Sequence, residues 1–237
     1  CFQLAGFPIL IAVAIVFGRE ISADQKSHAF IILFNSLIDK FAVDNKIAVS
    51  DSEIDAYLRA LAEGQAKLIR KLEDARRTVK KEMNSPVLSE EGRAKKEAEL
   101  NQLEKLLKRA RERSEDVSGS GPEAKKVHTE AFEKIQKWKV NSELYRKYGG
   151  RIIGPATEPE AFDAKQKYFR RQAEAGSFKI LNKDMESRFW NILTNETYYA
   201  PLFIPEGDKD RVMSRPWWLT EDSAATNSAT AVPAGGK

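Results

Sequence analysis

Two long charged segments in the middle of the chain constrain its fold more than any other feature. Residues 50–83 and 89–115 each carry apolar residues three and four positions apart, with dense Lys, Arg, Glu and Asp between them. That spacing places the apolar side chains on one narrow face of a helix. The residues between the segments, 84–88, suffice only for a turn. We therefore predict a long antiparallel helical hairpin at 50–115, with a contact stripe of mainly Leu and Ala.

Capping and breaking signals divide the rest of the chain into further helices. Ser50 and Glu53 have the spacing of a capping box, in which the serine hydroxyl accepts an amide and the glutamate reaches back. Glycine-containing breaks at 116–121 and 149–150 end helices. Further helix starts are predicted at Asp24, Ser89, Pro122 and Thr157, and at Asn182 or Asp184.

These elements predict a mainly α fold. The expected architecture is a multi-helix orthogonal bundle with the long antiparallel hairpin and one or two short strands, one of them at 151–153. We divide the chain into an apolar N-terminal segment (1–23), one helical domain (24–220) with its hairpin arm at 50–115, and a tail (221–237). The tail is rich in Ala, Ser, Thr and Gly without apolar periodicity, which predicts disorder.

The apolar N-terminal segment allows several interpretations. The sequence begins with Cys1, and its apolar run at 6–17 is shorter than the roughly 20 residues that span a bilayer. Followed by Ile21-Ser22-Ala23, the run is typical of a secretory signal with its cleavage site. Its β-branched residues before Gly18 equally fit a short buried strand and turn. A lipid anchor on Cys1 is a third alternative.

The composition leaves little material for catalysis or metal binding. One Cys excludes an internal disulfide and a zinc site with several thiolates. His28 and His128 are 100 positions apart, and neither has a nucleophile or acid at catalytic spacing. Gly149-Gly150-Arg151 could hold an anion, but a helix stop explains it better. We predict no catalytic residues, no metal and no cofactor.

The charge pattern argues against a nucleic-acid partner. The chain has 39 Lys and Arg against 35 Asp and Glu, which gives a formal net charge of +4. The basic residues of the hairpin alternate with acids, as in a solvated helical arm with ion pairs one turn apart. The hairpin also lacks the interleaved aromatic residues of a single-strand binder.

Aromatic residues are the sequence's main indication of a binding site. Most should be core, but a surplus of rings can line an apolar groove that binds a partner or a peptide. The expected peptide-binding cradle consists of Phe30, Phe34, Phe41, Tyr57, Trp138 and Tyr145.

The N-terminal third resembles a known family. Residues 16–22 (VFGREIS) are similar to the V-N-G-x-x-I-T strand and turn that opens the chaperone domain of SurA-like and PrsA-like extracytoplasmic folding factors. Leu37-Ile38-Asp39-Lys40 and residues 42–55 are similar to the following helix and connection, although Asn45-Lys46 replaces the family's usual Gly. A parvulin-type prolyl isomerase module is not recognisable. The resemblance implies a peptide-binding scaffold without catalysis, and it favours a strand at 13–21.

The sequence therefore predicts an extracytoplasmic, periplasmic chaperone-like protein. It would bind unfolded or extended polypeptide clients without catalysis, and it could associate with a membrane through its N-terminus. The alternative is a structural or assembly protein that docks a partner through the charged hairpin. The oligomeric state and the client do not follow from the sequence.

Overall fold

Helices make up most of the protein. The computed structural model describes residues 23–86 and 88–219, and it has the mainly helical class that the sequence predicts. No strand occurs in these residues, so the strand predicted at 151–153 is wrong there; Ile153 forms only isolated antiparallel bridges, to Glu160 and to Phe203. The helices are α1 (Ala23–Asp44), α2 (Asp51–Met83), α3 (Glu90–Val117), α4 (Ala124–Tyr148), α5 (Phe162–Glu174), α6 (Lys183–Thr194), α7 (Glu196–Tyr199) and α8 (Lys209–Ser214), with the 3₁₀ helices η1 (Ala200–Leu202) and η2 (Glu206–Asp208).

The described chain divides into two compact units, where the sequence predicts one helical domain. Unit 1 comprises the described residues of Cys1–Ala48 and Gln136–Trp217, and unit 2 those of Val49–Ile135 and Trp218–Lys237. The predicted strand at 13–21, signal segment and tail lie outside the described residues. Within the described part, no helix is both long and apolar enough to span a bilayer.

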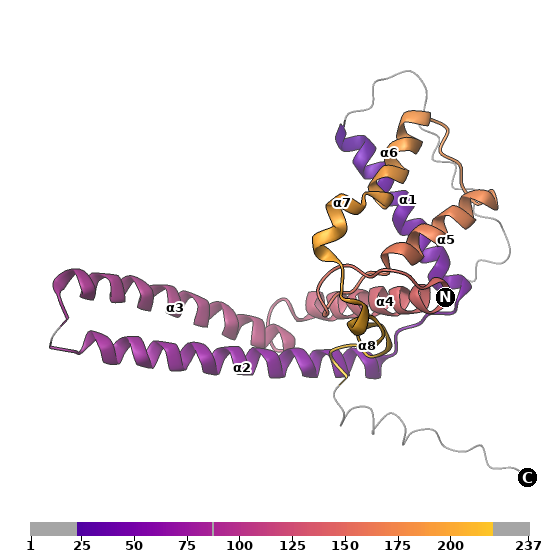
Figure 1. The fold of residues 1–237 in the computed structure, drawn as a ribbon. Helices are drawn as coiled ribbons and strands as arrows, with labels where there is room; N and C mark the ends of the chain where they lie inside the picture. The colour runs from indigo at the N-terminus through magenta and orange to yellow at the C-terminus, as the bar shows by residue number, and fades with distance from the viewer. Residues whose placement is uncertain (1–22, 87, 220–237) are drawn as a thin grey trace, which may run out of the picture. The chain divides into compact units, whose positions relative to one another are not determined.

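Unit 1 is built around rings contributed by α1, α5 and α6. Phe34 of α1 packs edge-on against Phe169 of α5, with ring centroids 5.2 Å apart, and Phe30 lies 5.8 Å from Phe189 of α6. These three helices are grouped together in Figure 1. Because their apolar positions recur every three or four residues, each helix turns one face toward this core. The core also contains Leu33, Leu37, Phe41, Ala42, Val140, Leu144, Ile152, Ala161, Ala164, Tyr168, Phe178, Val212 and Met213.

The segment before α5 is held by backbone pairing, which corrects a predicted helix start. The sequence predicts this helix from Thr157, but α5 begins at Phe162. Ile153 and Glu160 exchange two backbone hydrogen bonds of 2.9 and 2.8 Å, so residues 153–160 form a closed loop. The buried Asn141 side chain of α4 then accepts a 3.0 Å hydrogen bond from the Ala161 amide. These contacts fix the position of Glu160 at the entry to α5.

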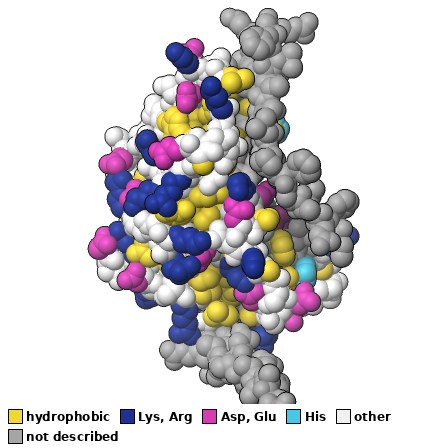
Figure 2. Space-filling view, turned by 90° about the vertical axis from the view of Figure 1, so that its right-hand side faces the viewer, with side chains coloured by type: hydrophobic (Ala, Val, Ile, Leu, Met, Phe, Trp, Pro, Cys, Tyr) yellow, Lys and Arg dark blue, Asp and Glu magenta, His cyan; other side chains and the backbone are white. Residues whose placement is uncertain are grey.

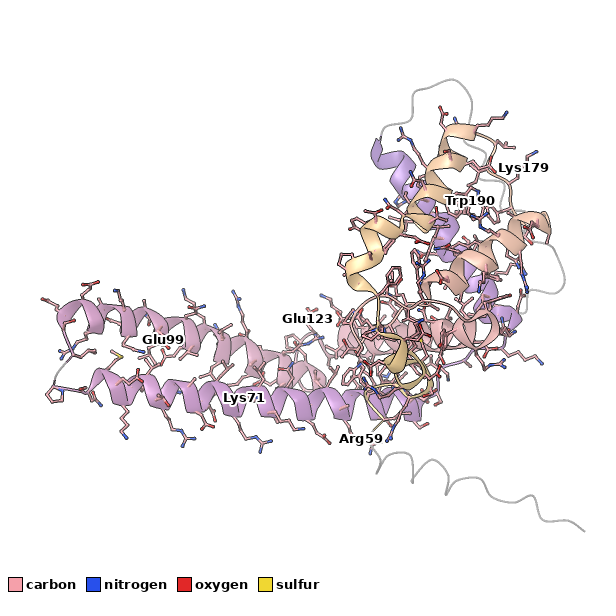
Figure 3. The ribbon with its side chains drawn as sticks, in the orientation of Figure 1. Arg59, Lys71, Glu99, Glu123, Lys179 and Trp190 are labelled. Atoms are coloured by element: carbon pink, nitrogen blue, oxygen red, sulfur yellow. The ribbon has the colours of Figure 1, made fainter. Side chains whose placement is uncertain are left out.

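In unit 2, α2 and α3 lie side by side and are joined by a short turn (Figure 1). Ser50 caps α2, and both hydrogen bonds of the predicted capping box are present. Ion pairs link the two helices along their length: Glu73 with Arg111 at 2.8 Å, Glu82 with Lys96 at 2.7 Å, and Glu104 with Arg76 and Lys80 at 3.7 and 3.9 Å. Figure 3 labels Lys71 and Glu99 among the charged side chains of this pair.

Candidate functional site

The six rings predicted to line a peptide-binding cradle occupy different environments. Phe41 is 1% exposed and belongs to the core of unit 1. Tyr57 is buried as well, but in unit 2, where its ring packs 5.2 Å from Trp218. Closed packing of this kind leaves Phe41 and Tyr57 no surface to offer to a client.

Trp138 and Tyr145 are half-buried and use their polar atoms within unit 1. The Trp138 indole donates a 3.2 Å hydrogen bond to the Val212 carbonyl. The Tyr145 hydroxyl donates to Asp210 at 2.9 Å. Both rings therefore tie α4 to the segment that contains α8.

Phe30 and Phe34 line an apolar pocket in unit 1. The pocket has a cavity volume of about 150 Å³. Ile192 of α6 is part of the lining, and because it is 53% exposed it lies where the pocket meets the surface. Figure 3 labels the neighbouring residue of α6, Trp190. The pocket is lined by Phe30, Phe34, Ile153, Glu160, Phe162, Lys165, Phe189, Ile192, Leu193 and Tyr199.

An ion pair between a buried lysine and a partly exposed glutamate lies in the wall of this pocket. The Lys165 ammonium donates to Glu160 Oε2 at 2.8 Å, and the other carboxylate oxygen, Oε1, lies 2.5 Å from the Lys137 ammonium. Lys165 is only 5% exposed, and its ammonium lies 5.4 Å from the centre of the Phe34 ring. A charge this deeply buried is found where it has a partner or a function.

The ion pair shifts the pKa of both partners. Burial raises the pKa of the Glu160 carboxyl, but the attraction of Lys165 and the hydrogen bonds from Lys137 and Lys165 outweigh this and lower it to about 2. Burial lowers the pKa of the Lys165 ammonium, and the attraction of Glu160 opposes that effect. At neutral pH Glu160 is therefore a carboxylate held between two lysines.

A second charged cluster explains the Gly149-Gly150-Arg151 motif. The Arg151 amide, which could have held an anion, donates to Asp163 Oδ2 at 2.8 Å. The Arg151 guanidinium binds Asp163 at 2.9–3.2 Å and Glu196 at 2.7 Å, and it lies 4.7 Å from the centre of the Phe203 ring. Burial raises the pKa of Asp163, but hydrogen bonds from Arg151 outweigh this and lower it. The motif ends α4 and joins it to α5 and α7.

His28, His128 and the Asn195-Glu196-Thr197 sequence, which has the pattern of a glycosylation acceptor, have surface or structural positions. His28 on α1 and His128 on α4 are both exposed. Over the described residues, no group of His, Cys, Asp or Glu has the arrangement of a metal site. Asn195, the first residue of the Asn-Glu-Thr pattern, caps α7 by accepting a hydrogen bond from the Tyr198 amide.

Apolar side chains also reach the surface outside the pocket. On the face in Figure 2, hydrophobic side chains form patches between Lys, Arg, Asp and Glu. Leu181 of unit 1 is 71% exposed, and Leu68 and Leu106 of unit 2 are 44% and 41% exposed. Scattered exposure of this kind is common in proteins and does not by itself define a site.

Sequence reasoning found two residues of the pocket and missed its polar wall. Lys165 and Glu160 resemble any other charges of a helix surface, because nothing in their spacing indicates burial. The sequence does contain a local indication that Lys165 is buried. Lys165 follows Phe162 and Ala164 and precedes Tyr168 and Phe169, and these four apolar residues are buried. A lysine on the core-facing side of a short helix is the feature to look for.

Comparisons with protein-family models, with curated proteins and with solved structures find no match for this chain.

Proposed function

We propose that the protein binds apolar side chains of unfolded or extended polypeptides in the pocket of unit 1, without catalysis. The observation that carries this proposal is the pocket itself: a cavity of about 150 Å³ lined mainly by Phe, Ile, Leu and Tyr side chains, with Ile192 exposed at its edge. Burying one large apolar side chain contributes roughly 1.5–3 kcal/mol. One such contact gives weak and promiscuous binding, which suits a protein that holds clients transiently.

The proposal retains Phe30 and Phe34 of the predicted cradle as direct contacts. Phe41, Trp138 and Tyr145 support it from the packed interior of unit 1, and Tyr57 belongs to unit 2. We also propose that the helices form an orthogonal bundle and that α2 and α3 form an antiparallel hairpin arm. The resemblance in the N-terminal third supports a further proposal, kinship with SurA-like chaperone domains. The same resemblance and the apolar run at 6–17 support a periplasmic location and membrane association through the N-terminus.

The test compares two variants of unit 1, in each of which an exposed apolar residue is replaced by aspartate. Ile192→Asp places a charge at the pocket, whereas Leu181→Asp places one on a more exposed site that does not line it. Binding of a fluorescently labelled, permanently unfolded polypeptide is measured by anisotropy. We expect Ile192→Asp to weaken binding about tenfold, which corresponds to about 1.4 kcal/mol, and Leu181→Asp to leave it within twofold.

Either of two results contradicts the proposal. The wild-type protein could fail to bind the unfolded polypeptide or to suppress its aggregation at several-fold molar excess. Alternatively, both aspartate variants could bind as well as the wild type, in which case binding occurs elsewhere.

The second candidate function is assembly through the charged pair of helices in unit 2. It is favoured by Leu68 on α2 and Leu106 on α3, which expose apolar surface on these charged helices. A stable oligomer in light scattering that dissociates on Leu68→Asp, together with no affinity for a peptide library, would support this function over polypeptide binding.

A further inference from the structure

The polar wall of the pocket carries an excess of positive charge. Lys137 and Lys165 share one carboxylate, Glu160, so the three groups sum to one positive charge. Lys137 has a half-exposed side chain, whereas Lys165 is almost completely buried. Lys165 therefore holds its charge where solvent screens it least.

The Lys165 ammonium has more donors than partners. An ammonium group carries three N–H donors. Among the described residues its one hydrogen-bond acceptor is Glu160, and it also lies over the face of the Phe34 ring. Buried donors without acceptors are costly, and hydrogen bonds between ionised groups are about twice as strong as neutral ones. An anionic acceptor is the chemistry that this wall of the pocket favours.

The remaining walls limit the size of the group that enters. A cavity of about 150 Å³ lined by Leu, Ile and Phe is known to hold one benzene molecule. This pocket has the same volume and a similar lining, with Phe30, Phe162, Phe189, Leu193 and Tyr199 around the space next to Lys165. One ring or one branched aliphatic group fills it.

We propose that the pocket binds a compact apolar group that bears a carboxylate. The apolar group lies among the phenylalanine rings, and the carboxylate accepts from the Lys165 ammonium. Glu160 stays paired with Lys137, so the bound anion brings the sum of charges to zero. Such a ligand is either a free aromatic or branched acid or the C-terminal residue of a polypeptide that ends in an apolar side chain. This inference rests on the proposed function and names the ligand class of the same pocket.

The decisive experiment compares benzoate with benzamide, which has nearly the same shape but no charge. Dissociation constants are measured by calorimetry or by ligand-observed NMR. A hydrogen bond between ionised groups is about twice as strong as a neutral one, so we expect benzoate to bind at least tenfold more tightly than benzamide, which corresponds to about 1.4 kcal/mol. A second pair, acetyl-Gly-Gly-Phe with a free and with an amidated C-terminus, separates the two sources: a preference for the free terminus that exceeds the benzoate preference identifies the chain end.

Two substitutions in the polar wall should change the preference for benzoate over benzamide in opposite directions. Lys165→Met removes the charge and keeps the length of the side chain, and Lys137 remains as a partner for Glu160. It should equalise benzoate and benzamide without weakening benzamide. Glu160→Gln removes the competing carboxylate and should strengthen benzoate binding. Lys179→Met, on an exposed lysine of unit 1 that Figure 3 labels, is the matched control and should change neither.

The outcomes separate this inference from the proposed function. Equal affinity of the wild type for benzoate and benzamide overturns the carboxylate inference and leaves apolar binding standing. A benzoate preference that survives in Lys165→Met also overturns it. If neither ring binds and the unfolded polypeptide does not bind either, both proposals fail. If Lys165→Met does not fold, the Glu160→Gln result decides, and an unchanged benzoate affinity contradicts the inference.

Discussion

At the scale of single residues, the buried hydroxyl of Tyr168 stands out in unit 1. It is inaccessible to solvent and has no hydrogen-bond partner among the described residues, while its ring packs 4.9 Å from Phe41. An unsatisfied buried polar group costs about 1–3 kcal/mol. The ring thus stabilises the folded protein, whereas the unpaired hydroxyl destabilises it.

Removing that hydroxyl should therefore not destabilise the protein. We expect Tyr168→Phe to leave the free energy of unfolding unchanged or to raise it by about 1 kcal/mol. Tyr145→Phe is the matched control, because the Tyr145 hydroxyl donates to Asp210, and it should lower the free energy by about 1 kcal/mol. Urea unfolding followed by circular dichroism measures both. A loss in Tyr168→Phe equal to that in Tyr145→Phe would show that the hydroxyl has a partner.

The lowered pKa of Glu160 predicts how stability depends on pH. A carboxyl whose pKa falls from 4.5 to about 2 on folding stabilises the folded state above pH 4.5. This contribution disappears as the pH falls from 4.5 to about 2. The shift corresponds to roughly 3 kcal/mol.

Glu160→Gln isolates this effect from the other acids. The free energy of unfolding is measured for the wild type and the variant between pH 6 and pH 2. The wild type should be more stable at pH 6, and the difference between the two proteins should shrink between pH 4.5 and 2. A difference that is constant with pH would mean that Glu160 has an ordinary pKa in the folded protein.

At the scale of helices, two glycines of unit 2 differ in their backbone conformation. Gly64 lies inside α2, and a Cβ added there would meet no atom within 4 Å. Gly119, just after α3, has equal space but a φ of 85°. Alanine favours a helix over glycine by about 1 kcal/mol, but a positive φ strains any side chain.

The same substitution should therefore have opposite effects at the two positions. We expect Gly64→Ala to raise the free energy of unfolding by about 1 kcal/mol and Gly119→Ala to lower it by a similar amount. Thermal and urea unfolding of both variants provide the measurement. If both changes stabilise, the turn after α3 does not have the left-handed conformation.

The helices also show what a sequence can and cannot predict. Ser50, Ser89 and Asn182 cap the helices that they were expected to cap, because a capping interaction involves neighbours in the chain. The start of α5 was misplaced because Glu160 pairs with Ile153 instead of entering the helix. That pairing depends on a loop closed by tertiary contacts, which local propensity does not encode.

The same distinction explains the outcome at the candidate site. The helical periodicity of α1 identified Phe30 and Phe34 as members of an apolar face, and both line the pocket. The pocket's other walls come from α5, α6 and α7, more than a hundred residues further along the chain. Their convergence is a property of packing, so neither the pocket nor the burial of Lys165 could be read from spacing.

At the scale of the whole molecule, the two units differ in what they offer to a ligand. Every residue that lines the pocket belongs to unit 1. The long helices α2 and α3 of unit 2 are covered with charge, and their ion pairs are largely exposed, so each contributes little to stability. If the pocket is the binding site, the outer parts of α2 and α3 are dispensable for it.

Shortening these helices tests that conclusion. Deleting residues 73–83 and 90–100 removes eleven residues, or about three helical turns, from each helix and keeps the turn at 84–89. The deletion removes one buried residue, Val79, and retains the other buried residues of unit 2, among them Ile54, Tyr57, Leu107 and Val117. We expect the shortened protein to bind the labelled unfolded polypeptide within twofold of the wild type, and circular dichroism should report only the loss of the deleted turns.

The result distinguishes the two candidate functions, because the outer parts of α2 and α3 serve them differently. An assembly protein that docks through these helices would lose its oligomeric state in light scattering when they are shortened. A polypeptide-binding protein would keep its affinity, since no lining residue has moved. A shortened protein that folds but no longer binds the polypeptide would show that α2 and α3 form part of the binding surface, and the pocket of unit 1 would then be insufficient by itself.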